Sequence, residues 1–488
     1  MSPVLLFSFV IGYFLILLGV AWYTGKNSDN QSFFIGNRNS NWMLVAFGMV
    51  GTSLSGVTFV SVPGAVARES FAYLQITIGY LLGYLMIAYI LLPLYYRLNL
   101  TSIYNYLGSR LGKSSYKTGS SFFILSRVLG ATARLYLVVN ILQEAILNSF
   151  NIPFWATTLI ILVMILLYTF EGGVKTIVYT DTLQTSCMLA GLVICVIYIL
   201  NKMDMGLGES LQVMSQKGYS KIFFTDPNSK LFFVKQIIAG AFITVTMTGM
   251  DQEMMQKNIS VKNLKDSQKN VLSMAVVLAA VLVIFLFLGG LLYIYAASVN
   301  ITATGDKIFP VIALQHMPPY VSVIFIIALI SALFPSADGA ITALTSSFCI
   351  DILGIQRRED LSAARQKKIR QMVHLSFAGI FLLFVMVFKW VNDPSMIGLL
   401  LKIAAYTYGP LLGLFSFGIL TSKSVKDKLV PYICIASPIL CFMLEKYQKV
   451  LFGSFEFGLE LLIINGTITF LGLLLISADK QPSAAKTA

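Results

Sequence analysis

Long apolar segments separated by short polar connections dominate the pattern of hydrophobic and polar positions along the chain. An α-helix needs about twenty mostly apolar residues to cross the hydrocarbon core of a bilayer. The segments are continuously apolar and lack the period-two alternation of barrel strands, so the pattern predicts membrane-spanning helices. We predict thirteen spans, at 3–24, 41–65, 72–98, 115–147, 152–170, 173–201, 231–252, 268–298, 319–350, 368–391, 396–422, 428–446 and 455–477.

Composition supports this interpretation. Of the 488 residues, 57% are hydrophobic and only 12% are charged, which is typical of a multi-pass helical membrane protein rather than of several soluble domains. The net charge of +13 requires no nucleic-acid partner, because short cytoplasmic loops are rich in Lys and Arg. The distribution of these residues predicts a plasma-membrane protein with its N-terminus outside and its C-terminus in the cytoplasm. The polar tail 479–488 is predicted to be disordered.

Little in the sequence favours catalysis or a bound metal cluster. The five cysteines lie in or beside apolar segments and form no CxxC pair, so we expect them to pack rather than to form disulfides or bind metal. Two histidines, His316 and His374, are too few and too far apart for a metal site. No HExxH or GxSxG motif lies in the spans. We therefore expect a protein that is not an enzyme and has no organic cofactor.

Two predicted spans carry polar groups at membrane depth. Asp181 lies inside the span 173–201, and an ionisable group in that position is a functional-site hypothesis by default, unless it sits hydrated near the membrane surface. The segment 51–58 in the second span collects glycines and hydroxyl side chains. Such a cluster breaks a helix and frees carbonyls for a cation or substrate, or alternatively allows close helix packing.

The fourth span carries two arginines, Arg127 and Arg134, seven residues apart on nearly one helical face. A buried guanidinium keeps its charge and needs an anion. That anion is Glu144, another acid in the bundle, or the carboxylate of a substrate. Arg134 lies nearer the middle of the span and is the better substrate candidate.

Several segments resemble one known family. The stretch GGVKTIVYTDTLQ at 172–184 closely resembles the most characteristic segment of the sodium/solute symporter family, which includes sodium–glucose, sodium–proline and sodium–sialic acid carriers. The segment DQEMMQK at 251–257 resembles the end of the family's sixth core helix, and YGPLLGL at 408–414 resembles its tenth. The span 319–350 is similar to the eighth core helix.

The resemblance implies an all-α integral membrane protein with a LeuT-type fold of two inverted five-helix repeats. It implies one transmembrane domain, 1–478, that works as a monomer in the lipid bilayer. Within that domain we expect an added helix at 3–24, repeat one at 41–201, repeat two at 231–422 and peripheral helices at 428–477.

A first sodium site is implied where the second span breaks. The carbonyls of Gly51, Leu54 and Ala332 and the hydroxyl of Ser336 would bind the ion, with Pro335 in a place where the family has a second hydroxyl. An unbroken helix through 51–56, or a Ser336 far from the break, would contradict this site.

A second cation site is predicted from Asp181 and Asp338, unless Asp338 pairs with Lys402 or an arginine instead. We expect two basic residues, Arg134 and Lys402, to face a cavity, which favours an anionic solute, either a carboxylate or a sialic-acid-like molecule. The sequence thus predicts sodium-coupled uptake of a small organic anion, with a neutral sugar or polyol and proton coupling as alternatives. Substrate contacts are predicted from Ser53, Ser55, Thr58, Gln75, Arg134, Thr248 and Lys402.

Overall fold

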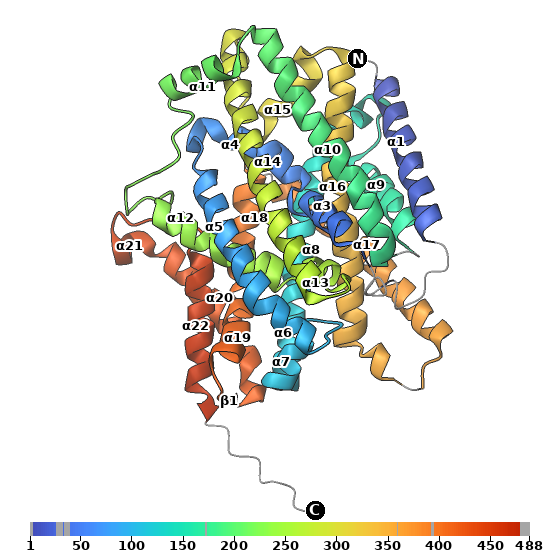
Figure 1. Ribbon diagram of the computed structural model, residues 1–488, viewed down its shortest axis with the longest axis vertical. Coiled ribbons are helices and arrows are strands. Elements are labelled where there is room, and N and C mark those ends of the chain that lie inside the picture. Colours follow the sequence, from blue (N-terminus) through green and yellow to red (C-terminus); the bar gives the residue numbers. More distant parts are fainter. Residues whose placement is uncertain are drawn as a thin grey trace, which may run out of the picture.

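The computed structural model describes residues 3–25, 33, 40–170, 173–358, 360–391 and 395–478. In these residues the chain forms a bundle of helices, most of which run along the long axis of the molecule (Figure 1). A helix bundle pairs most backbone groups inside their own helices, as a lipid environment requires. The tail 479–488, predicted to be disordered, and Gly172 of the family motif lie outside the described residues.

The elements have the following bounds. The helices are α1 Pro3–Thr24, α3 Trp42–Ser53, α4 Gly56–Glu69, α5 Tyr73–Met86, α6 Leu92–Arg97, α7 Asn105–Arg110, α8 Lys113–Ala145, α9 Phe154–Thr169, α10 Gly173–Met203, α11 Leu207–Gln216, α12 Phe233–Thr244, α13 Gln252–Ile259, α14 Leu264–Ser298, α15 Ile308–Val311, α16 Pro319–Ser347, α17 Ala363–Val391, α18 Met396–Thr407, α19 Gly409–Leu420, α20 Val430–Lys446, α21 Gln448–Phe452 and α22 Leu461–Leu475. Short π-helical turns at Ile87–Leu91, Val245–Gly249 and Phe348–Ile352 extend α5, α12 and α16. Two short strands, β1 Ser424–Val425 and β2 Ser477–Ala478, pair antiparallel.

Each predicted span coincides with a helix or with consecutive helices of the structure. Within the described residues, 8 helices are long and apolar enough to cross a membrane, or up to 11 if each bent pair is one span. Two further apolar helices, α9 and α22, are shorter. The structure therefore confirms a multi-span helical protein, and the total of thirteen spans stays a prediction.

Three pairs of consecutive helices bend sharply at a short break; two of the breaks lie inside the predicted spans 41–65 and 396–422, and the third lies at the end of the predicted span 231–252. The angle is 55° between α3 and α4, 65° between α12 with its π turn and α13, and 45° between α18 and α19. Each break has a local cause. Leu54 and Ser55 leave helical geometry between α3 and α4, Asp251 accepts hydrogen bonds from the first amides of α13, and Pro410 at the start of α19 has no N–H to donate.

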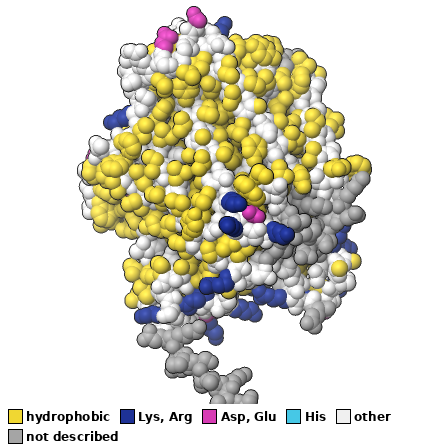
Figure 2. Space-filling view, viewed as in Figure 1, with side chains coloured by type: hydrophobic (Ala, Val, Ile, Leu, Met, Phe, Trp, Pro, Cys, Tyr) yellow, Lys and Arg dark blue, Asp and Glu magenta, His cyan; other side chains and the backbone are white. Residues whose placement is uncertain are grey.

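The core of the bundle lies around α16, in which every residue from Leu329 to Ser347 is buried. Helix α10 packs along α16 and along α3, so the Asp181 segment faces the broken span. Figure 2 shows hydrophobic side chains over the middle of one face and Lys and Arg side chains gathered towards its lower end, where α7 and β1 lie in Figure 1. An apolar belt with basic residues at one end fits the predicted membrane orientation.

Candidate cation and substrate site

The break between α3 and α4 lies against α16, as the sequence predicts. Gly51 lies in the last turn of α3 and Leu54 is its C-cap residue, so their carbonyls stand at a helix end, where the helix supplies no further amides. An ideal Cβ on Gly56 would lie 3.8 Å from the amide nitrogen of Leu333, and the Ser336 hydroxyl donates a 2.8 Å hydrogen bond to the Leu333 carbonyl. The broken span and the Ser336 turn therefore lie on helices that are in contact, and carbonyl and hydroxyl oxygens are the ligands that a hard cation prefers.

Close packing of α3 against α10 explains Gly51. A Cβ at this position would lie 2.1 Å from the hydroxyl oxygen of Thr185, so only glycine lets the two helices approach. The Thr185 hydroxyl is buried and, among the described residues, has no hydrogen-bond partner. It therefore adds an oxygen next to the predicted cation ligands that the sequence analysis did not identify.

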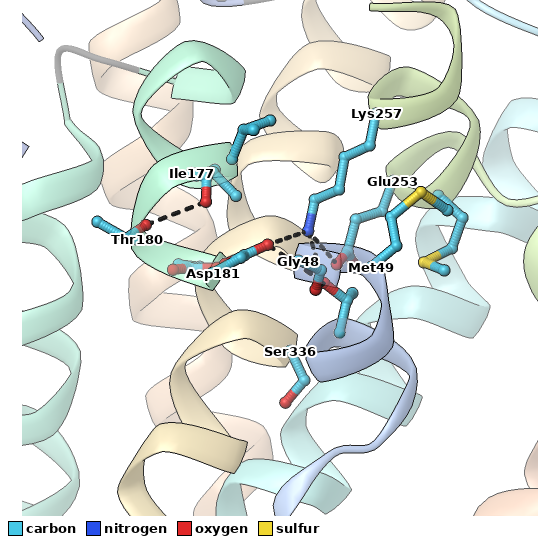
Figure 3. A network of polar contacts seen from close by, with 12 residues as sticks. Gly48, Met49, Ile177, Thr180, Asp181, Glu253, Lys257 and Ser336 are labelled. Atoms are coloured by element: carbon cyan, nitrogen blue, oxygen red, sulfur yellow. Dashed lines mark hydrogen bonds and ion pairs between the residues drawn. The ribbon is translucent and has the colours of Figure 1, made fainter. Parts of the chain in front are cut away.

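The carboxylate of Asp181 forms an ion pair with Lys257. The ammonium of Lys257 lies 2.7 Å from Asp181 Oδ2 and 2.8 Å from the hydroxyl oxygen of Thr52. Figure 3 shows the lysine side chain reaching from α13 towards Asp181, with Glu253 beside it. Ser336, on α16, lies below this group in the same view. Asp181 and Lys257 are 1% and 3% exposed, so this charge pair is shielded from water.

The network continues to Arg127. Its guanidinium forms an ion pair with Glu253 and lies 3.8 Å from Asp251 Oδ2, while the Oε1 of Glu253 lies 3.8 Å from the Lys257 ammonium. Glu253 fits against α16 because Gly339 has no side chain there; a Cβ would lie 2.4 Å from Glu253 Oε1. Of the anions that the sequence left open for Arg127, an acid of the bundle is the partner, and Glu144 is hydrogen-bonded by Asn140 instead.

Among the described residues, Asp338 pairs with neither Lys402 nor an arginine. The carboxylate accepts a 2.7 Å hydrogen bond from the Tyr168 hydroxyl, and Lys402 pairs with Glu445 at 2.7 Å. Within the described part of the chain, Asp338 has no ion pair, and its second oxygen has no hydrogen-bond partner. Asp338 directly precedes Gly339, where a Cβ would lie 3.2 Å from the Lys257 nitrogen, so this part of α16 borders the ion pairs of Asp181 and Glu253.

A central cavity opens beside the break. Its polar wall comes from α3, α4, α8 and the π turn after α12, and its apolar wall includes residues of α14 and α18. Five of the seven predicted substrate contacts line it. These are Ser53, Ser55, Thr58, Arg134 and Thr248.

Arg134 is the distinctive group of this cavity. Arg127, the other cation in the wall, is neutralised by Glu253. Arg134 has no ion pair among the described residues, its Nε has no hydrogen-bond partner, and no carboxylate lines the cavity. An unpaired guanidinium in a recessed apolar and hydroxyl-lined wall is a site for a planar anion such as a carboxylate.

The structure does not bring Gln75 and Lys402 to this cavity. The Gln75 amide bonds the Leu231 carbonyl and the Phe224 amide, which fastens α5 to the connection before α12. Lys402 lines a second cavity together with Glu69, Lys230 and Glu445. The two cavities share three lining residues, Tyr73, Ile397 and Leu401.

The ion-pair network was the main feature that sequence reasoning missed. The motif DQEMMQK was recognised at 251–257, but its glutamate and lysine were not assigned a partner. Glu253 and Lys257 are four residues apart, and this spacing places both on one face of a helix, where they can interact. The partners on α8 and α10 are far away in the sequence and could not be identified from local spacing.

Comparisons with known proteins agree with this architecture. The profile of the "Sodium:solute symporter family" matches residues 33–427, which is most of the chain. The protein therefore belongs to the sodium:solute symporter family, a family of multi-pass membrane transporters.

The relatives compared below are less than 30% identical to this chain. The "Sodium/sialic acid symporter SiaT" of Proteus mirabilis is 23% identical over 95% of this chain and 94% of its own length. The "Sodium-coupled monocarboxylate transporter 1" of Mus musculus is 27% identical over 86% of this chain and 68% of its own length. A solved structure of a Na⁺-coupled sialic acid symporter in a substrate-bound outward-open state covers 96% of this chain and 97% of its own, with a TM-score of 0.83 and 21% identity. This likeness establishes a LeuT-like fold.

Proposed function

We propose that this protein is a sodium-coupled symporter that takes up a small organic anion across the plasma membrane. The observation that carries the proposal is Arg134, which among the described residues has no ion pair and lies in the wall of a cavity that no described carboxylate lines. The relatives named above include carriers of sialic acid and of monocarboxylates, and both solutes contain a carboxylate.

The coupling ion would bind at the break in the second predicted span. The carbonyls of Gly51, Leu54 and Ala332 and the hydroxyl of Ser336 are its ligands in this proposal, and Pro335 removes an amide from α16 at the same level. All of these ligands are neutral oxygens, which suit a monovalent cation that must leave again on the other side.

Binding of the sodium ion and binding of the solute would each strengthen the other through the break between α3 and α4. Ser53 and Ser55 face the solute cavity, while Gly51 and Leu54 in the same stretch supply ion ligands. A cation that orders this stretch therefore orders the solute contacts, and the effect is reciprocal. Each positive charge that moves inward across about 100 mV releases about 2.3 kcal/mol, which drives uptake against a gradient.

The remaining assignments follow from the same architecture. We place the N-terminus outside and the C-terminus in the cytoplasm, since basic residues gather at one end of the bundle (Figure 2). The chain would work as a monomer of thirteen spans in the lipid bilayer, built from repeats at 41–201 and 231–422. It would carry out no chemical reaction, because coupled transport needs only alternating access to the two sites.

The proposal is tested by counterflow of labelled solutes in proteoliposomes that contain sodium. The panel compares sialic acid, a short monocarboxylate and a neutral sugar. We expect exchange of one carboxylate, and its loss in Arg134→Gln. The matched control is Lys402→Gln, which removes the same charge from a residue outside the central cavity. Exchange of the sugar alone, or unchanged carboxylate exchange in Arg134→Gln, would contradict an anionic solute.

A further inference from the structure

The ammonium of Lys257 lies where the sequence predicts a second sodium ion. It contacts Asp181 Oδ2 at 2.7 Å, the Thr52 hydroxyl oxygen at 2.8 Å and Glu253 Oε1 at 3.8 Å. These oxygens come from three helices, α10, α3 and α13. A buried place of this kind, with two carboxylates and a hydroxyl, suits a monovalent cation, and the lysine supplies one from within the chain.

The charges around this place explain why a cation is needed there. Among the described residues, the three buried carboxylates of Asp181, Asp251 and Glu253 form ion pairs with two cations, Arg127 and Lys257, and a fourth buried carboxylate, Asp338, has no ion pair. Without Lys257, Asp181 would have no ion pair among the described residues. An uncompensated carboxylate at this depth is strongly unfavourable, so some cation must stand beside it.

We propose that Lys257 is a tethered cation that fills the second cation place, so that the transporter binds a single sodium ion, at the break between α3 and α4. A sodium ion beside Asp181 would lie within a few ångströms of the ammonium, and the two positive charges would repel one another. The lysine is covalently part of α13, so its charge stabilises Asp181 without being transported. This inference rests on the sodium-coupled function proposed above and specifies its ion stoichiometry.

Thr52 links this place to the first cation site. It lies between Gly51 and Leu54 in the sequence, and its hydroxyl accepts a hydrogen bond from Lys257 while lying 3.3 Å from both Asp181 Oδ2 and the Gly48 carbonyl. The tethered cation therefore also fixes the end of α3, whose carbonyls are the proposed sodium ligands.

The experiment measures equilibrium binding of ²²Na⁺ to the purified full-length protein in detergent, without any solute. We expect the wild-type chain to bind about one ion, and Lys257→Met to bind about two, because the vacated place then accepts sodium beside Asp181. The sodium-induced rise in melting temperature should be larger for this variant than for the wild type, since a buried carboxylate regains its cation. The matched control is Lys262→Met, a neighbouring lysine that is exposed, and it should behave as the wild type.

A double variant keeps the inference testable if Lys257→Met does not fold. Lys257→Met with Asp181→Asn removes the pair as a unit and leaves no unpaired charge, so it should bind about one ion. Two ions in the wild type, two in the double variant, or one in a folded Lys257→Met would each overturn the tethered cation. No sodium binding by the wild type would instead overturn the proposed function itself, so the two failures are distinguishable.

Discussion

The hydroxyl of Tyr408 donates a 2.6 Å hydrogen bond to Asp251, and this contact joins two of the three helix breaks. Tyr408 lies between α18 and α19, and Asp251 lies directly before α13. The other carboxylate oxygen of Asp251 accepts hydrogen bonds from the first amides of α13. Arg127 approaches the same Asp251 oxygen at 3.8 Å. The Asp251 carboxylate therefore connects the two bends with α8, the helix that carries Arg127.

Removing the hydroxyl should loosen this junction. Tyr408→Phe deletes one hydrogen bond to a charged group and leaves the aromatic ring, so we expect a loss of about 1.5–3 kcal/mol of stability. Thermal and denaturant unfolding in detergent measure it. Tyr432→Phe is the control, because Tyr432 is 70% exposed on α20 and should tolerate the change. Equal stability of the two variants would show that the junction contributes nothing.

The two arginines of α8 should respond in opposite ways. Arg127→Gln leaves Glu253 without its closest cation and should destabilise the fold by about 3–5 kcal/mol. Replacing both partners, as Arg127→Met with Glu253→Met, should recover much of that loss, because no buried charge is then left unpaired. Unfolding measurements on the single and double variants test this.

Arg134→Gln should instead leave stability nearly unchanged or raise it, because it removes a guanidinium that has no ion pair among the described residues. The effect should appear in solute binding, as a loss of at least about 1.5–3 kcal/mol for a carboxylate. Isothermal titration with the solute that exchanges in counterflow measures this loss. A large loss of stability with unchanged binding would reverse the roles that we assign to the two arginines.

Ser336 offers a direct test of the first cation site. Ser336→Ala should weaken sodium binding about tenfold, which corresponds to about 1.4 kcal/mol for one lost oxygen ligand. Ser331→Ala is a matched control in the same buried helix, since that hydroxyl donates to the hydroxyl oxygen of Tyr13. Sodium-dependent thermal stabilisation of the two variants gives the comparison, and equal sodium affinities would remove Ser336 from the site.

Lys402 should matter little for transport. Its side chain is 53% exposed and pairs with Glu445 in the second cavity, and an exposed pair contributes about 0–1 kcal/mol. Lys402→Gln should therefore change the apparent KM for the solute by less than about threefold. A large rise in KM would show that the second cavity takes part in the rate-limiting binding step.

The sequence predicts a break within the segment 51–58 because glycines and hydroxyls gather there, and it places Asp181 inside a span because its neighbours are apolar. It does not predict which charges meet. Glu144 lies on the same helix as Arg127 but bonds Asn140, whereas the true partner, Glu253, comes from another helix. Likewise Asp338 meets Tyr168. Such pairings depend on how helices far apart in the sequence pack together, and local patterns carry no record of that packing.

The central claim is that a sodium gradient drives uptake of an organic anion. The most direct measurement is accumulation of a labelled carboxylate in proteoliposomes with an inward sodium gradient, compared with choline in place of sodium at fixed pH. The account predicts accumulation with sodium, none with choline, and none in Arg134→Gln. Equal accumulation in choline, or accumulation driven by a pH gradient alone, would contradict it.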